Sequence, residues 1–138
     1  MSNVLFVCVA NSGRSVMAER LFMAAERGGH AARSAGSSPG DAVHPEVLAA
    51  LHELGIDADD HVPRKLDDEA IAWADMVVAT CDDACPVVRG KRYVSWQLPD
   101  PKHRPLDEVR GIRDDIAVLV GRLVAELEDS AQPNLPVT

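Results

Sequence analysis

The most constraining feature of this sequence is the junction VCVANSGRSVMAERL, residues 7–21, where an apolar run ends in a cysteine and a helical pattern follows. Residues 4–8 have the apolar, β-branched character of a buried parallel strand, and residues 15–26 place apolar side chains at helical spacing. A loop that joins a strand to a helix N-terminus exposes backbone N–H groups at the positive end of the helix dipole. Gly13 permits an unusual backbone angle, and Arg14 adds a planar fork of donors. The junction therefore predicts a loop that binds a tetrahedral oxyanion.

The cysteine of this loop, Cys8, is the candidate nucleophile. The field that attracts an oxyanion also favours a thiolate, and the Ser15 hydroxyl is in a position to donate a hydrogen bond to the sulfur. The alternative is an inert buried thiol beside a surface arginine. The spacing of Cys8, Arg14 and Ser15 favours the nucleophile. A nucleotide-binding loop is disfavoured because it needs Gly-Lys-Ser/Thr at the helix start, and this loop has no lysine.

Length and charge restrict the class of protein. With 138 residues, 46% of them hydrophobic, the chain fits one domain with a substantial core. The formal net charge of -8 argues against nucleic acid or an anionic membrane as a partner, because both require a basic surface. The N-terminus shows no secretory pattern and no apolar run has the length of a membrane span, so we expect a cytoplasmic protein.

Further strands and helices are expected along the chain. Extended segments are predicted at residues 31–35, 76–80 and 91–96, and helices at 45–54 and 68–74, the second capped by Asp67. The last helix carries the clearest apolar stripe, formed by Val109, Ile112, Ile116, Leu119, Leu123 and Leu127. We expect that stripe to face the core, residues 1–128 to form the domain, and residues 129–138 to be a frayed tail.

This alternation of strands and helices indicates an α/β domain with a mainly parallel sheet. Such sheets bind ligands beyond the carboxyl ends of their strands, and Cys8 and Cys81 both follow predicted strands directly. Cys85 lies four positions after Cys81, close enough for a disulfide if the segment is helical or turns back. A zinc site needs four ligands, and the five histidines show no paired spacing. Redox chemistry is therefore favoured over a metal site or inert buried thiols.

Residues 8–15, CVANSGRS, resemble the signature loop of the low-molecular-weight tyrosine phosphatase superfamily, which includes arsenate reductases built on the same fold. The stretch MVVATCDDACPVVRGKRYVSWQLPDP, residues 76–101, resembles the redox segment of the arsenate reductases that thioredoxin regenerates. The similarity extends to about Leu127 through four further stretches: MAERLF, SAGS, HPEVLAALHELGID and RGIRDDI. The resemblance implies a single-domain three-layer sandwich, with a four-stranded parallel sheet flanked by helices.

The resemblance also implies a mechanism. Cys8 attacks arsenate, and Asp100 protonates the departing oxygen as general acid. Cys81 then attacks the adduct and releases arsenite, leaving a Cys8–Cys81 disulfide. Cys85 next attacks Cys81, and the resulting Cys81–Cys85 disulfide is reduced by thioredoxin, with a mycothiol- or glutaredoxin-type donor as the alternative. The implied substrate-binding residues are Val9, Ala10, Asn11, Ser12, Gly13, Arg14 and Ser15.

The sequence departs from these relatives at a potassium site. Glu19 and Ser34 match residues that help to hold potassium in some relatives, but Arg64 stands where those relatives have an acidic ligand. We therefore expect a cation from Arg64 or Lys65 in place of the metal, and we assign neither a metal nor a cofactor. His30, His44, His52 and His61 are interpreted as surface or capping residues, and Trp73 and Trp96 as core or cleft-wall aromatics.

Two other functions stay open. A phosphatase acting on phosphotyrosine or small phosphoesters would use Cys8, Arg14 and Asp100 without Cys81 and Cys85. Lys102 weakens that interpretation, because phosphatases of the superfamily usually carry tyrosine after the Asp-Pro pair. The second is an oxyanion or redox sensor without turnover, whose output would not depend on Asp100.

Overall fold

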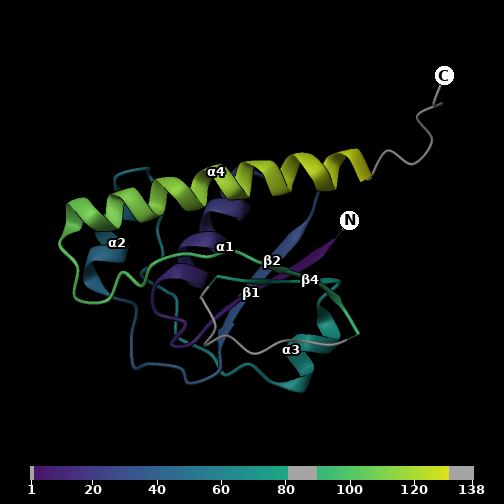
Figure 1. The fold of residues 1–138 in the computed structure, drawn as a ribbon, viewed down its shortest axis with the longest axis horizontal. Coiled ribbons are helices and arrows are strands. Elements are labelled where there is room, and N and C mark those ends of the chain that lie inside the picture. The colour runs from purple at the N-terminus through teal and green to yellow at the C-terminus, as the bar shows by residue number, and fades with distance from the viewer. Residues whose placement is uncertain (1, 81–89, 131–138) are drawn as a thin grey trace.

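The computed structural model describes residues 2–80 and 90–130, which form a parallel sheet with helices on both faces (Figure 1). The sheet has four strands in the order β2-β1-β3-β4, and the predicted three-layer α/β architecture is confirmed. The strands are β1 (Asn3–Cys8), β2 (Ala31–Gly36), β3 (Met76–Ala79) and β4 (Arg92–Ser95). Each coincides with an extended segment expected from the sequence.

The helices divide unequally between the two faces of the sheet. They are α1 (Arg14–Ala25), α2 (Pro45–His52), α3 (Asp68–Trp73) and α4 (Leu106–Ser130). Figure 1 shows α1, α2 and α4 on one side of the strands and α3 on the other. The Asp67 side chain accepts a hydrogen bond from the backbone N–H of Ala70, as expected for the residue that caps α3.

Two apolar clusters lie on opposite faces of β1. Val4 and Phe6 pack into the cluster shared with α1, α2 and α4, whereas Leu5 and Val7 pack into the smaller cluster beneath α3. Because both faces are covered, the strand is apolar along its length rather than alternating. The stripe on α4 faces the larger cluster, with Leu119 partly buried and its other members buried, so its predicted core role is confirmed.

The last helix, α4, continues to Ser130, and residues 131–138 lie outside the described part of the chain. The domain boundary at residue 128 and the frayed tail after it therefore stay predictions. Among residues 2–80 and 90–130, no helix has both the length and the apolarity needed to cross a membrane.

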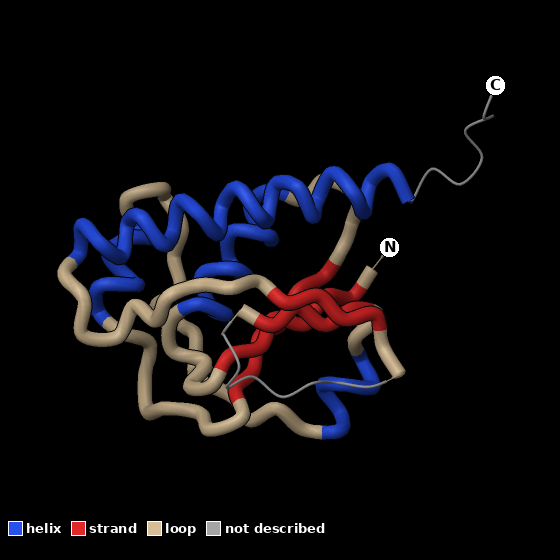
Figure 2. The backbone as a smooth tube through the Cα atoms, in the orientation of Figure 1, coloured by secondary structure: helices blue, strands red, loops and turns tan. Residues whose placement is uncertain are grey.

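The strand order reverses at β1. The chain moves from β1 to β2 on one side and then returns across β1 to β3 on the other, within the sheet that Figure 2 draws in red. In open parallel sheets, ligands bind where the strand order reverses in this way. The loop after β1, which begins at Cys8, lies at that point.

Candidate active site

The loop between β1 and α1 is held in place by its own carbonyl groups. The chain between β2 and α2 donates four backbone hydrogen bonds to these carbonyls. The carbonyls of Cys8, Val9, Ala10 and Ser12 accept from Ser37 (3.2 Å), Ser38 (2.8 Å), Gly40 (2.8 Å) and His44 (3.0 Å), respectively. Within the described chain, the N–H groups of Val9, Ala10, Ser12 and Gly13 have no protein acceptor. These donors therefore stay available for an oxyanion, as the sequence predicts for this loop.

Gly36, the last residue of β2, allows the sheet to approach this loop closely. A Cβ atom at Gly36 would lie 2.5 Å from the carbonyl oxygen of Val9 and 2.9 Å from the backbone nitrogen of Asn11. Any larger residue would push the loop away from the strand. This role was not predicted, although a glycine at the end of a predicted strand is a signal of close backbone approach.

Two donors converge on the buried sulfur of Cys8. The backbone N–H of Asn11 lies 3.2 Å from Sγ, and the Ser15 hydroxyl lies 2.9 Å from it. The Asn11 side-chain amide donates to Ser15 Oγ at 2.8 Å. Since Ser15 accepts from Asn11, its own proton is free to point at the sulfur. Donors in this arrangement stabilise a thiolate, the form in which cysteine is a nucleophile.

Asn11 is the residue that organises this network. It is fully buried and has a positive φ of 50°, a conformation that asparagine adopts more readily than most residues. Its Oδ1 accepts from the backbone N–H of Arg64 at 3.0 Å and contacts His61 Nε2 at 2.9 Å. Because that backbone N–H can only donate, the Asn11 atom is the carbonyl oxygen, and His61 Nε2 must carry a hydrogen.

The interpretation of His61 as a surface or capping residue is wrong. The side chain is half-buried against the loop between β1 and α1, residues 9–13, which we call the catalytic loop, and supports it through Asn11. Burial lowers the pKa of His61; the charge of Glu19 acts in the opposite direction, and those of Arg20 and Arg64 add to the lowering. The neutral tautomer with hydrogen on Nε2 fits this position. The contact joins residues 50 positions apart in the sequence, so no local pattern indicates it.

The other three histidines of that interpretation differ in their burial and contacts. His30 is buried, and its Nδ1 accepts the backbone N–H of Ser2 at 2.9 Å, so the surface prediction is wrong for this residue as well. His44 occupies the N-cap position of α2 but makes no side-chain capping bond. It lines the cavity beside Cys8 instead. His52 is exposed, as expected.

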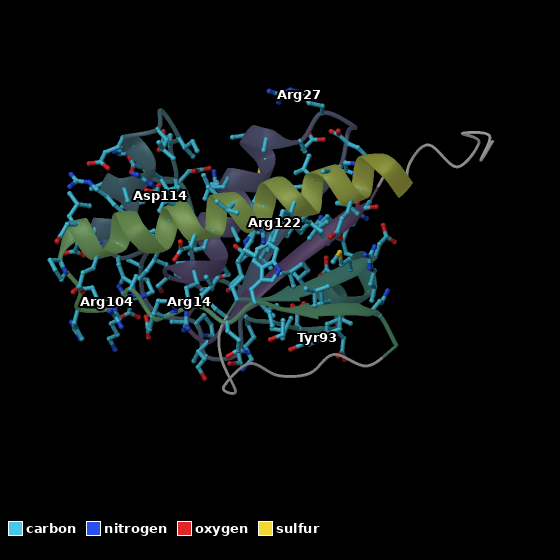
Figure 3. All side chains as sticks on the ribbon, turned by 45° about the horizontal axis from the view of Figure 1, so that its top comes forward. Arg14, Arg27, Tyr93, Arg104, Asp114 and Arg122 are labelled. Carbon is cyan, nitrogen blue, oxygen red and sulfur yellow. The ribbon has the colours of Figure 1, made fainter. Side chains whose placement is uncertain are left out.

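Arg14 and Asp100 meet at the mouth of this cavity. Arg14 is buried, donates from Nη1 to the carbonyl of Leu98 at 3.0 Å, and places Nη2 3.9 Å from Asp100 Oδ2. Figure 3 shows Arg14 and Arg104 on the same side of the molecule, below α4 in that view. The Asp100 side chain is exposed, and its other oxygen accepts the backbone N–H of Lys102 at 2.9 Å. The predicted general acid is therefore brought to the predicted anion-binding arginine.

Gly13 sets how close the Asp100 loop comes. A Cβ atom on Gly13 would lie 2.6 Å from Cγ of Pro101, the residue after Asp100. The glycine therefore lets the two loops pack directly against each other. Gly13 permits the close approach of Pro101, in addition to the loop conformation that the sequence predicts.

The cavity so formed has a volume of about 150 Å³. Its lining includes three predicted catalytic residues together with much of the predicted binding loop: Cys8, Val9, Ala10, Ser12, Gly13, Arg14 and Asp100, joined by His44 and Lys102. Ser15 contacts the Cys8 sulfur, and the Asn11 side chain donates to Ser15. The two remaining predicted catalytic residues, Cys81 and Cys85, lie outside the described residues.

The predicted replacement of a potassium ion by Arg64 or Lys65 is corrected by the surroundings of Glu19. Its Oε1 accepts from the Ser34 hydroxyl at 2.9 Å, and its Oε2 lies 2.8 Å from Nε of Arg20. Arg20 and Glu19 form an ion pair, although Arg20 Nε does not have the geometry of a hydrogen-bond donor to the carboxylate. Lys65 instead donates to the carbonyl of Ser37 at 2.7 Å. The cation beside Glu19 is therefore its chain neighbour, Arg20.

Comparison with known proteins agrees with this architecture. The family described as low molecular weight phosphotyrosine protein phosphatase matches residues 3–133. A protein named arsenate reductase 2 from Staphylococcus epidermidis is 30% identical over 121 residues, which cover 85% of this chain and 92% of that protein.

Two solved structures represent different activities on this fold. A thioredoxin-dependent arsenate reductase from Corynebacterium glutamicum is 34% identical with a TM-score of 0.78; the match covers 94% of this chain but 63% of that one. The arginine phosphatase YwlE from Geobacillus stearothermophilus is 26% identical with a TM-score of 0.86, and the match covers 97% of each chain.

Proposed function

This chain belongs to the low molecular weight phosphotyrosine protein phosphatase family, and on that premise we propose that it is an arsenate reductase, which converts arsenate to arsenite in arsenic detoxification. The observation that carries the proposal is the site around Cys8. A nucleophilic sulfur lies in an oxyanion loop, and β3, whose next residues lead to Cys81, is paired directly with the strand that ends at Cys8. The similarity to arsenate reductases at about 30% identity supports the same activity.

The first step forms a bond between Cys8 and arsenic. Arsenate binds to the free N–H groups of the loop and to the Arg14 guanidinium, which is already oriented by the Leu98 carbonyl. The Cys8 thiolate attacks the arsenic atom, and the Ser15 hydroxyl and Asn11 N–H hold the sulfur. Asp100, exposed at the mouth, gives its proton to the oxygen that leaves as water.

The second stage transfers two electrons from sulfur to arsenic. The Cys81 thiolate attacks the Cys8 sulfur, an S–S bond forms, and the electron pair of the S–As bond stays with arsenic, which departs as arsenite. The Cys85 thiolate then attacks Cys81, which releases the Cys8 thiolate and leaves a Cys81–Cys85 disulfide. A protein dithiol reduces that disulfide and returns all three cysteines to the starting state.

The proposed electron donor is thioredoxin. Three cysteines provide a relay that ends in an ordinary protein disulfide, the substrate of a thioredoxin-type dithiol. The similar Corynebacterium glutamicum enzyme is described as thioredoxin-dependent. A mycothiol- or glutaredoxin-type donor is the alternative, and both systems fit the cytoplasmic location that we propose.

A phosphatase is the second candidate function. The described cavity contains the nucleophile, arginine and acid that a phosphoester needs, and an arginine phosphatase shares this fold over 97% of the chain. Phosphate and arsenate have the same shape and charge, so binding alone does not separate the two activities. The difference lies in Cys81 and Cys85, which hydrolysis does not use.

The decisive assay runs both reactions side by side. Arsenate-dependent oxidation of NADPH is followed with thioredoxin and thioredoxin reductase, and hydrolysis of p-nitrophenyl phosphate and phosphoarginine is followed on the same preparation. We expect arsenate-dependent oxidation that stops in the Cys8→Ser variant. Efficient hydrolysis of a phosphate compound without any arsenate-dependent oxidation would instead identify a phosphatase.

A further inference from the structure

A second cavity lies on the α3 side of the sheet, away from the sulfur of Cys8. We call it the rear cavity. It has a volume of about 320 Å³, against about 150 Å³ for the cavity that holds Cys8. Neither Cys8 nor any residue of the catalytic loop lines it. The two cavities are therefore distinct, and the rear one is large enough for more than a single tetrahedral anion.

Three cationic side chains, Arg33, Arg64 and Lys65, line the rear cavity. Within the described residues, none of the three forms an ion pair with a carboxylate. This is unusual in a chain with a formal net charge of -8, where carboxylates outnumber cations. Two guanidinium groups and an ammonium group in one cavity are the donor set that recognises phosphate groups.

Arg33 is oriented before any ligand arrives. Its guanidinium carbon lies 4.3 Å from the centroid of the Trp73 ring, a stacking distance at which the ring attracts the cation. Lys65 is fixed as well, since its Nζ donates to the Ser37 carbonyl. Preorganised donors lose less entropy when a ligand binds.

The remaining lining defines the rest of the ligand. The buried Leu5 and Ala35 and the partly buried Ala70 form the apolar floor of the cavity, and the volume leaves room for a carbon framework beside a phosphate group. Two carboxylates, Asp67 and Glu69, also line the cavity. Asp67 is engaged as the cap of α3, accepting from Ala70. Glu69 is an acceptor suited to a hydroxyl or amino group on the ligand.

From these features we infer that the rear cavity is a second binding site, for a small organic phosphate. The phosphate group pairs with Arg33, Arg64 and Lys65, and the carbon framework covers the apolar surface. Its occupancy acts on the catalytic loop because Arg64 belongs to both regions: Arg64 lines the rear cavity, and its backbone N–H donates to Asn11 Oδ1 at 3.0 Å.

The test is a titration of the ¹⁵N-labelled full chain with phenylphosphonate, a stable compound that carries an aromatic ring and a phosphonate. We expect two groups of amide shifts with separate dissociation constants, one from the catalytic loop, such as Ala10 and Gly13, and one from the rear cavity, such as Ser34 and Ala70. Inorganic phosphate, which lacks the ring, should bind the rear cavity more weakly. The Asn11 side-chain NH₂ signals should include a component that follows the rear-cavity constant.

Matched charge-neutralising variants separate the two sites. Arg33→Gln should weaken the rear-cavity constant about tenfold, the effect of one charge-assisted pairing, and leave the catalytic-loop constant unchanged. Arg27→Gln is the control with the same change of charge, because among the described residues the Arg27 guanidinium bonds only to carbonyls of its own turn, and it lies apart from Arg14 in Figure 3. The inference is wrong if rear-cavity amides do not shift when the catalytic loop is saturated, or if Arg27→Gln and Arg33→Gln have equal effects. If phosphate and phenylphosphonate bind the rear cavity with equal affinity, the inference that its ligand has an organic part is wrong.

Discussion

Thr80 donates two hydrogen bonds to the carbonyl oxygen of Val7, one from its backbone N–H at 2.8 Å and one from its hydroxyl at 2.9 Å. Val7 immediately precedes Cys8, and Thr80 immediately precedes Cys81. The ends of β1 and β3 are therefore fastened together at the last residue before each cysteine. This fixed pairing supports a relay in which the first nucleophile and the second thiol act on the same arsenic adduct.

Asn11→Asp should slow the chemistry at Cys8 while keeping the shape of the loop. The carboxylate still accepts from Arg64 N–H and His61, but it cannot donate to Ser15, whose proton then turns away from the sulfur. Losing one buried hydrogen bond predicts about a tenfold fall in kcat/KM for arsenate. Steady-state kinetics measure this, and Asn3→Asp, at a residue bonded to the Trp73 carbonyl, is the matched control. Equal rates in wild type and Asn11→Asp would show that Ser15 does not orient the sulfur through Asn11.

His61 should make the folded state less stable in mild acid. Burial lowers the pKa of His61 in the folded state below its ordinary value of 6.5, so the unfolded chain takes up a proton first as the pH falls. Stability is therefore full above about pH 6.5, declines below it, and levels off once the pH is below the folded-state pKa. His61→Gln keeps a donor for Asn11 Oδ1 and should remove this part of the pH dependence.

Urea unfolding between about pH 5 and 8 measures that contribution. His52→Gln is the control, since His52 is exposed and contacts Asp57 and Asp59 rather than the catalytic loop. If wild type and His61→Gln lose stability identically over this range, the proposed effect of burying His61 is wrong.

Gly13→Ala should separate anion binding from catalysis. The new methyl group would meet Pro101 at 2.6 Å and move the Asp100 loop outward, while the backbone donors of the loop remain. We expect kcat to fall about a hundredfold, the low end for a lost general acid, with a smaller change in the dissociation constant for phosphate. Gly111→Ala, with nothing within 4 Å of the added carbon, is the matched control. A dissociation constant that rises as much as kcat falls would place the damage in the binding loop instead.

Lys102 should favour small inorganic anions over aryl phosphates. Its side chain lines the mouth of the cavity with Arg14 and His44, adding positive charge where a phosphotyrosine ring would need an apolar wall. Lys102→Tyr is expected to raise KM for arsenate several-fold and to lower KM for p-nitrophenyl phosphate, and Lys102→Arg should restore the wild-type ratio. An unchanged ratio of the two KM values in Lys102→Tyr would remove Lys102 from substrate selection.

Much of this site could be predicted because its parts are local in the sequence. Cys8 and Arg14 belong to one strand-loop-helix unit, and a parallel strand buried on both faces is a continuous apolar run that is easy to recognise. The helix stripe on α4 is equally direct, because its period of three and four residues specifies one buried face. These patterns predict the sheet and the loop, whereas Asp100 is expected as the acid only because of the resemblance to the phosphatase superfamily.

The supporting contacts could not be predicted, because they join residues distant in sequence. His61 reaches Asn11 across 50 positions, and Gly36 matters only because β2 packs against the loop. The prediction of the cation beside Glu19 failed for the opposite reason. Arg20 is adjacent along the helix, and neighbouring helical side chains normally diverge. Here the long arginine side chain returns to the carboxylate, with a separation of 2.8 Å.

The central claim is that the three cysteines reduce arsenate in a fixed order, and a single turnover without external reductant tests it most directly. The fully reduced protein is mixed with arsenate, arsenite is quantified, and disulfides are mapped by mass spectrometry. We predict about one arsenite per chain with a Cys81–Cys85 disulfide in wild type, arsenite with a Cys8–Cys81 disulfide in Cys85→Ser, and no arsenite in Cys81→Ser. Release of arsenite by Cys81→Ser at the wild-type level, or no arsenite from the wild type, would contradict the account.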